Sequence, residues 1–285
     1  MKIANSETTA FTPPPTVRGG RIDFKTLLEG HRGTPTNYQL LLADTDITFK
    51  SPRHRHNFDQ LRYSVRGPTH TGDDCVIGEG ELAYFPEGCY YGPQDQSRCK
   101  AGSLTMVIQF GGPSGNGYIS RAEMENAFHE LSQSGDFEQG VYKRRSPEAG
   151  EKKNQDAYEA IWEHHNHRKL TYPKPRFATP VRFSEAHFEW MPAADTAGVW
   201  HKHIATLTEA HLSLAFLKIE AGKSYELRSG VRTRLVFVKS GTGSAGEGGK
   251  WSPHTAMHLD PGESIVLSAN SESEMLLVDL PVLGK

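Results

Sequence analysis

The chain has 285 residues, enough for two ordinary domains or one large all-β domain. Its 32 basic and 34 acidic residues leave a formal net charge of −2, so composition favours neither nucleic acid nor anionic lipid as a partner. Three cysteines are too few for a disulfide framework, no apolar run could span a bilayer, and residues 1–20 lack the apolar core of a secretory signal; we therefore expect a cytoplasmic protein.

The first half is a series of short strands separated by glycine and proline turns. After residues 1–20, which we expect to form a loosely ordered arm or an edge element, apolar and polar residues alternate in the manner of half-buried strands. The predicted strands are residues 37–44, 60–67, 81–88 and 103–112. The glycine-rich segment 111–120 is expected to be a loop that could serve as a lid.

Two amphipathic helices are expected in the middle of the chain. In the first, Ser120 and Glu123 have the spacing of a capping box, apolar residues recur at helical spacing, and Gly135 is expected to end the helix. The second covers residues 156–167. Because the composition becomes polar over residues 137–180, we expect this segment to be an inter-domain spacer.

The second half returns to strands, predicted at residues 210–222, 232–243, 262–269 and 273–282. Their order resembles that of the first half, which indicates a weak internal duplication. Short strands at regular spacing favour an antiparallel barrel or sandwich in each half. The predicted domains are residues 1–136 and 181–285, joined by the linker 137–180.

Two spaced motifs in the first half resemble those of the cupin superfamily. The first motif contains His54, His56, Gln60 and Gly67. The second contains Gly80, Pro86, Gly88 and Tyr91. Because both spacings match, the resemblance implies an all-β chain with a few helices, built as two tandem cupin barrels of the double-stranded β-helix, or jelly-roll, type.

The resemblance also implies a metal site. Residues two apart on a strand face the same side, so His54 and His56 should both point into the barrel and bind a divalent metal, with Gln60 as third ligand or support. Fe(II) is the expected ion, and Zn, Ni, Cu and Mn are alternatives. The chain departs from the cupin pattern at two of four positions, because Gln60 replaces a glutamate and Tyr91 replaces a histidine. A pocket that holds an organic ligand without metal is therefore the alternative.

Arg62 should face the same interior, where a buried guanidinium needs an anionic partner. That partner is either a substrate carboxylate or an internal carboxylate. The segment His54–Gly67 also resembles gentisate dioxygenases and related bicupins, which implies that Arg62 anchors the substrate. Tyr91 is expected to donate a hydrogen bond or a proton. Tyr84 and Gln109 are candidates for lining the substrate pocket, with wall packing as the alternative for Tyr84.

The second half resembles a cupin that has lost its site. At the positions of the metal ligands it carries Arg228, Gly230 and Arg234, so its barrel is expected to be structural. A separate pair, His201 and His203, lacks the residues that follow at cupin spacing.

We therefore expect a bicupin with one functional barrel. The leading hypothesis is a non-haem metal-dependent enzyme of the dioxygenase type that acts on a small anionic or aromatic organic substrate. The alternatives are a non-catalytic small-molecule-binding protein, and a metal-free or zinc-bearing isomerase or cyclase with Tyr91 as the acid. A homodimer formed through edge strands is also expected.

Overall fold

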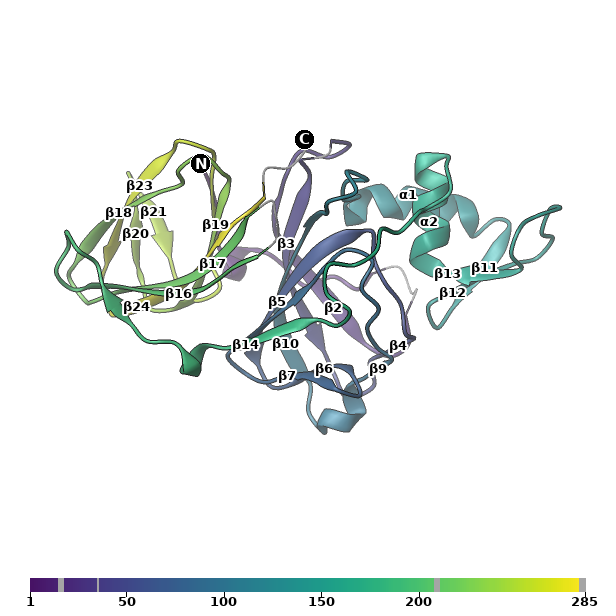
Figure 1. Cartoon of the computed structure of the whole chain (residues 1–285), viewed down its shortest axis with the longest axis horizontal. Helices are drawn as coiled ribbons and strands as arrows, with labels where there is room; N and C mark the ends of the chain where they lie inside the picture. The colour runs from purple at the N-terminus through teal and green to yellow at the C-terminus, as the bar shows by residue number, and fades with distance from the viewer. Residues whose placement is uncertain (15–17, 35, 208–210, 282–285) are drawn as a thin grey trace. The chain divides into compact units, whose positions relative to one another are not determined.

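The computed structural model describes residues 1–14, 18–34, 36–207 and 211–281, and it divides the chain into two compact units (Figure 1). The first unit runs from Phe11 to Arg182, and the second combines Met1–Ala10 with the described residues from Phe183 to Pro281. This division differs from the predicted one. The predicted spacer 137–180 packs as part of the first unit, and the first ten residues belong to the second. No described helix has the length and apolar composition needed to cross a membrane.

The first unit is built on antiparallel strands. They are β2 Ile22–Glu29, β3 Tyr38–Thr45, β4 Lys50–Ser51, β5 Phe58–Arg66, β6 Thr69–Gly72, β7 Cys75–Ile77, β8 Glu81–Phe85, β9 Gln94–Asp95, β10 Ser103–Gly111 and β14 Val181–Ser184. The main sheet has the order β14-β8-β5-β10-β3-β2, and β4-β9 and β6-β7 form two small sheets. The four predicted strands of this half are confirmed as β3, β5, β8 and β10.

Both predicted helices are present. Helix α1 (Arg121–Leu131) begins with the predicted capping box, in which the Ser120 side chain accepts from the Glu123 amide and the Glu123 carboxylate bonds back to Ser120. Helix α2 (Ala157–Asn166) is capped by Asp156. Their apolar faces pack against each other and against the barrel, which is why this segment does not behave as a free spacer.

A small sheet lies mostly within the segment 137–180 that was predicted to be an inter-domain spacer. Helix α1 ends at Leu131, not at Gly135, and Gly135 instead starts β11 (Gly135–Glu138), which pairs with β12 (Val141–Arg144). Strand β13 (Asn154–Asp156) pairs with β12 in turn. Phe137 and Tyr142 pack into the helix cluster. This burial stabilises strands that could not be predicted from their polar composition.

The second unit has a seven-stranded sheet facing a four-stranded one. Its strands are β1 Lys2–Ala4, β15 Met191–Pro192, β16 Val199–Leu207, β17 Leu212–Ile219, β18 Ser224–Arg228, β19 Arg234–Ser240, β20 Gly243–Ala245, β21 Gly249–Trp251, β22 Ala256–Leu259, β23 Ser264–Ala269 and β24 Ser273–Asp279. The sheet orders are β1-β22-β19-β24-β17-β16-β15 and β18-β23-β20-β21.

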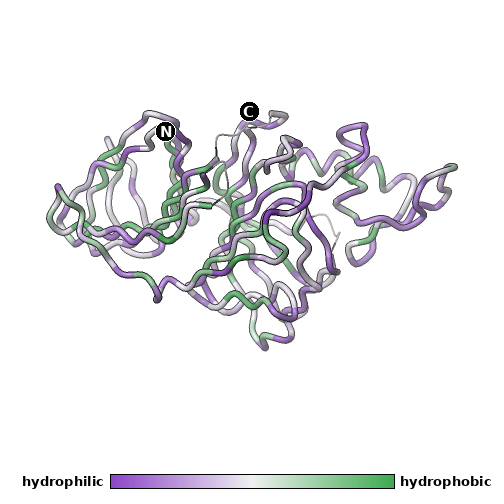
Figure 2. Tube along the Cα trace, viewed as in Figure 1, coloured by the Kyte–Doolittle hydropathy of each residue, from purple (hydrophilic) through white to green (hydrophobic). Residues whose placement is uncertain are grey.

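Apolar side chains from both sheets, including Trp251, Met257 and Leu267, form the core of this unit. Figure 2 shows hydrophobic residues following the strands of each unit, with hydrophilic residues in the connections. The four predicted strands are confirmed as β17, β19, β23 and β24, although the ends of the ranges 210–222 and 273–282 lie outside the described residues. The predicted edge element in residues 1–20 is β1; residues 15–17 of that range are not described.

Two motif glycines are explained by their backbone. Gly67 has φ of 68° and Gly88 has φ of 76°, a region that side chains rarely adopt. A Cβ at Gly67 would lie 2.6 Å from the Gly102 carbonyl oxygen, and one at Gly88 would lie 2.5 Å from the Pro173 carbonyl oxygen. Glycine at these two positions lets the chain turn sharply while neighbouring backbone lies directly against it.

Candidate functional site

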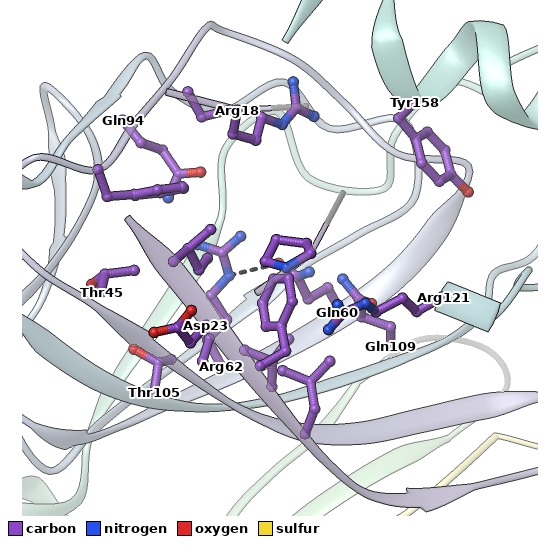
Figure 3. Close-up of a pocket in the computed structure, with 18 of the residues that line it drawn as sticks. Arg18, Asp23, Thr45, Gln60, Arg62, Gln94, Thr105, Gln109, Arg121 and Tyr158 are labelled. Atoms are coloured by element: carbon purple, nitrogen blue, oxygen red, sulfur yellow. Dashed lines mark hydrogen bonds between the residues drawn. The ribbon is translucent and has the colours of Figure 1, made fainter. Parts of the chain in front are cut away.

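A cavity of about 330 Å³ lies inside the first unit, lined by strands β2, β3, β5 and β10 and by both helices (Figure 3). The alternation predicted from the sequence holds along the segment that leads into β5. The residues of this segment that line the cavity are His54, His56, Phe58, Gln60 and Arg62. Every second side chain therefore points inward, because successive side chains of an extended chain face opposite sides.

Tyr91 stands opposite the two histidines. His54 and Tyr91 form an isolated antiparallel bridge, with N–H···O distances of 3.0 Å in both directions. This bridge directs both side chains to the same side. The Tyr91 hydroxyl oxygen then lies 2.9 Å from His54 Nε2, 2.8 Å from His56 Nε2 and 3.1 Å from an Arg62 nitrogen.

Counting donors and acceptors assigns the protons at this centre. His54 Nδ1 lies 2.7 Å from the Pro52 carbonyl oxygen, so Nδ1 carries the proton and Nε2 accepts from the Tyr91 hydroxyl. The Tyr91 oxygen then accepts from Arg62 and from His56, which must carry its proton on Nε2. His56 Nδ1 is a bare lone pair, consistent with its being buried without a hydrogen-bond partner. All the hydrogen-bonding capacity of the Tyr91 hydroxyl is used.

Burial keeps the two imidazoles and the phenol of this centre uncharged. Burial first, and the positive charge of Arg18 second, hold the pKa of His54 and His56 well below its usual range. Burial raises the pKa of Tyr91, and Arg62 and Arg18 act in the opposite direction. At neutral pH the centre therefore consists of two neutral imidazoles and a phenol beside two guanidinium groups.

A divalent cation does not fit this arrangement. It would need lone pairs from both imidazoles, but the His54 lone pair receives the Tyr91 hydroxyl and His56 presents an N–H. The Gln60 side-chain oxygen accepts from Arg62 Nε at 2.6 Å. No cluster of three histidine, cysteine or acidic side chains suited to a metal occurs among the described residues. The assignment of His54, His56 and Gln60 as metal ligands stays a prediction, and the arginines oppose it because they repel a cation.

The remaining predicted residues divide into those in the cavity and those outside it. Gln109 lines the cavity, and its side-chain oxygen accepts from the Tyr118 hydroxyl at 2.8 Å. Tyr84 does not line the cavity, so its prediction as a pocket residue is wrong. Strand alternation turns it to the opposite face of the sheet, where its hydroxyl donates to Asp59 at 2.8 Å.

Many residues that line the cavity were not predicted from the sequence, among them Arg18, Tyr118 and Arg121. Arg18 follows the first proline-rich stretch, and Tyr118 and Arg121 flank the start of α1. No spacing relates them to the two motifs, because the fold alone brings them to the barrel. Four arginines and one aspartate, Asp23, line the cavity, and Asp23 already pairs with Arg21 at 2.6 Å. Two of the other arginines have acidic neighbours outside the lining, Arg18 with Asp156 at 3.6 Å and Arg121 with Glu125 at 3.5 Å, whereas Arg62 forms no ion pair among the described residues.

The described part of the second unit has no comparable centre. Arg234, at one of the former ligand positions, forms a two-fold ion pair with Asp279 at 2.6 and 2.8 Å. His201 packs against Tyr225, and His203 is exposed on the same strand, β16. That the second barrel has only a structural role stays a prediction.

Solved structures resemble the chain over almost its whole length, although no protein-family model and no curated protein matches it. A putative dioxygenase from Nostoc punctiforme aligns with a TM-score of 0.63 and 10% identity, over 99% of this chain and 83% of that one. Oxalate decarboxylase from Bacillus subtilis, described with Mn(II) centres, gives 0.57 and 13%, over 98% and 77%. A putative glyoxylate-induced protein from Pseudomonas aeruginosa gives 0.58 and 11%, over 98% and 92%. These similarities show the fold: the chain is built as two tandem jelly-roll barrels of the cupin type.

Proposed function

We propose that the first barrel binds a small organic anion without a metal, and that Arg62 is the anchor for its acidic group. The observation that carries this proposal is the state of the Arg62 side chain. Its guanidinium lies inside the cavity and bonds to Gln60 and Tyr91, which are both neutral, and it forms no ion pair with any acidic side chain of the described residues.

An unpaired guanidinium in a half-enclosed cavity is costly, because the charge loses water without gaining a counter-ion. A ligand carboxylate would supply that counter-ion through charge-assisted hydrogen bonds. Arg18 adds positive charge to the same centre, which is why it lowers the pKa of both histidines. The cavity volume is also in the range of small-molecule sites.

To donate a hydrogen bond or a proton to the ligand, the Tyr91 hydroxyl would turn its one proton from His54 Nε2 toward the ligand. The N–H groups of His56 and Arg62, which both donate to the Tyr91 oxygen, support this role because they stabilise the phenolate that proton transfer would leave. Proton transfer of this kind is the chemistry of an isomerase or a cyclase. Without it, the same contacts make a binding protein.

A second candidate is the iron-dependent dioxygenase predicted from the sequence. Nε2 of His54 and Nε2 of His56 each lie within 2.9 Å of the Tyr91 hydroxyl oxygen, and a putative dioxygenase and a manganese enzyme share the fold. With His54, His56 and Gln60 as ligands, this candidate requires the proton of His56 to move to Nδ1, where no acceptor lies, and the Gln60 oxygen to leave Arg62 Nε.

Two measurements test the proposal. The metal content of protein purified without chelator is expected to be far below one ion per chain, and stoichiometric iron that is lost in His54→Ala would instead support the dioxygenase. Binding of heptanoate, measured by calorimetry, is expected in the wild type and lost in Arg62→Gln. The control is Arg66→Gln, which removes an exposed arginine from the same strand. Equal heptanoate affinity in the two variants would refute the anchoring role of Arg62.

A further inference from the structure

We propose that the ligand of the first barrel carries two acidic groups separated by an apolar body, and that Arg121 binds the second one. This inference rests on the proposed function, because it takes Arg62 as the anchor of the first group. It adds a residue, Arg121, that lies at a different part of the same cavity, and it narrows the ligand from any organic anion to a dianion.

The cavity surface between Arg62 and Arg121 is apolar. Arg62 on β5 is the cross-strand partner of Val107 on β10, and Val107 is the partner of Leu41 on β3. Side chains of paired residues lie on the same face of a sheet, so this row runs from the guanidinium into an apolar surface. Leu41, Ala43 and Val107 form one cluster, against which Ile22 and Phe24 of β2 pack.

Arg121 lies at the far end of this row. It is the first residue of α1, and its guanidinium stands over the Phe24 ring at 5.3 Å. Figure 3 shows Arg18, Arg62 and Arg121 entering the cavity from different sides. Arg18 belongs with Arg62, because it acts on the histidine pair. Arg121 therefore provides a separate positive centre.

The Arg121 side chain is poorly neutralised by the protein. It donates to the Pro13 carbonyl oxygen at 2.6 Å, but its Nε is buried without a hydrogen bond. Its acidic neighbour, Glu125, lies 3.5 Å away and is 44% exposed, so that pair is screened by solvent. Burial lowers the pKa of Arg121, which is the effect of desolvation on a charge with too little compensation. Arg121 is one of the residues that line the cavity, which places its side chain beside the space for a ligand.

The span between the two centres fits a short chain-like ligand. Strands β5 and β2 are three neighbours apart in the sheet, roughly 14 Å at about 4.8 Å per strand. Both arginine side chains reach inward and shorten this span. A volume of about 330 Å³ equals that of about eleven liquid waters, so the ligand has on the order of a dozen non-hydrogen atoms.

Linear dicarboxylates from succinate to azelate, each with the monocarboxylate of the same chain length, are suitable probes. In the wild-type protein, calorimetry is expected to show one dicarboxylate length that binds on the order of 10- to 100-fold more tightly than its monocarboxylate. In Arg121→Gln this ratio is expected to fall to about one, with monocarboxylate affinity unchanged within about two-fold. Arg66→Gln, which lies outside the cavity, is expected to keep the wild-type ratio.

The outcomes separate this inference from the proposed function. In one outcome, monocarboxylates depend on Arg62 for binding while no dicarboxylate binds more tightly than its monocarboxylate. That result would refute the proposal of a dianionic ligand and leave the proposed anion site at Arg62 intact. The dianion is also refuted if Arg121→Gln weakens both probe classes equally. If neither monocarboxylates nor dicarboxylates bind the wild-type protein, both the proposed function and the proposal of a dianionic ligand are refuted.

Discussion

The hydroxyl of Tyr91 provides the most direct test of the hydrogen-bond assignment at the centre of the first barrel. Tyr91→Phe removes one oxygen atom and keeps the ring, which packs against Phe85 at 4.8 Å. The change leaves three groups without their shared partner: His54 Nε2, His56 Nε2 and one nitrogen of Arg62. We expect the variant to fold and to be less stable.

The expected loss follows from these three contacts. A buried polar group left unpaired costs about 1–3 kcal/mol. Arg62 keeps its bond to Gln60, and water from the adjoining cavity can reach part of the vacated space. The three desolvation penalties therefore do not add in full, and we expect the free energy of unfolding to fall by about 2–4 kcal/mol.

Urea denaturation followed by circular dichroism at pH 7.5 measures this change. Tyr90→Phe is the matched control, because the neighbouring Tyr90 ring is 41% exposed and its hydroxyl should contribute less than about 0.5 kcal/mol. A Tyr91→Phe effect below about 1 kcal/mol would mean that the hydroxyl does not hold the two imidazoles together, and the proton assignment would have to be abandoned.

Three further predictions concern the same unit. Long-range ¹⁵N–¹H NMR correlations at pH 7 should show His54 protonated on Nδ1 and His56 on Nε2, and the reverse pattern in either ring would contradict the assignment. Burial raises the pKa of Asp59 to about 7, so between pH 4 and pH 7 the folded protein holds a proton that the unfolded chain has released. The free energy of unfolding should therefore decrease by roughly 4 kcal/mol as pH rises through that window, relative to Asp59→Asn. If the free energy of unfolding of the two proteins depends on pH in the same way, Asp59 does not hold this proton. Gly88→Ala should lower the melting temperature more than Gly80→Ala, because the two glycines share a positive φ but only Gly88 lies against another backbone.

The strand pattern of both units could be predicted because alternation is a local property. Each long strand that was predicted is present, and the spacing of His54, His56, Gln60 and Arg62 correctly predicts that these side chains share one interior. The glycine spacing of the motifs is local as well, since a sharp turn needs a residue that accepts positive φ.

The chemistry of the site could not be predicted in the same way. Whether two inward imidazoles offer lone pairs or protons depends on Pro52 and Tyr91, which the fold and not the spacing places beside them. Arg18 and Arg121 reach the cavity from segments that lie outside both cupin-like motifs. The strands β11 to β13 were missed because their stability comes from packing against the helices. The homodimer stays a prediction.

The pairing of β1 with β22 has a consequence for how the chain can be divided. Lys2, Ile3 and Ala4 pair with His258, Met257 and Ala256, so the second unit draws its outermost strand from the opposite end of the sequence. The first unit is thus an insertion within the second one. A fragment that starts near residue 183 would leave the β22 edge bare, and such an edge invites pairing between molecules. A practical expression fragment of that unit would need residues 1–10 joined to it by a linker.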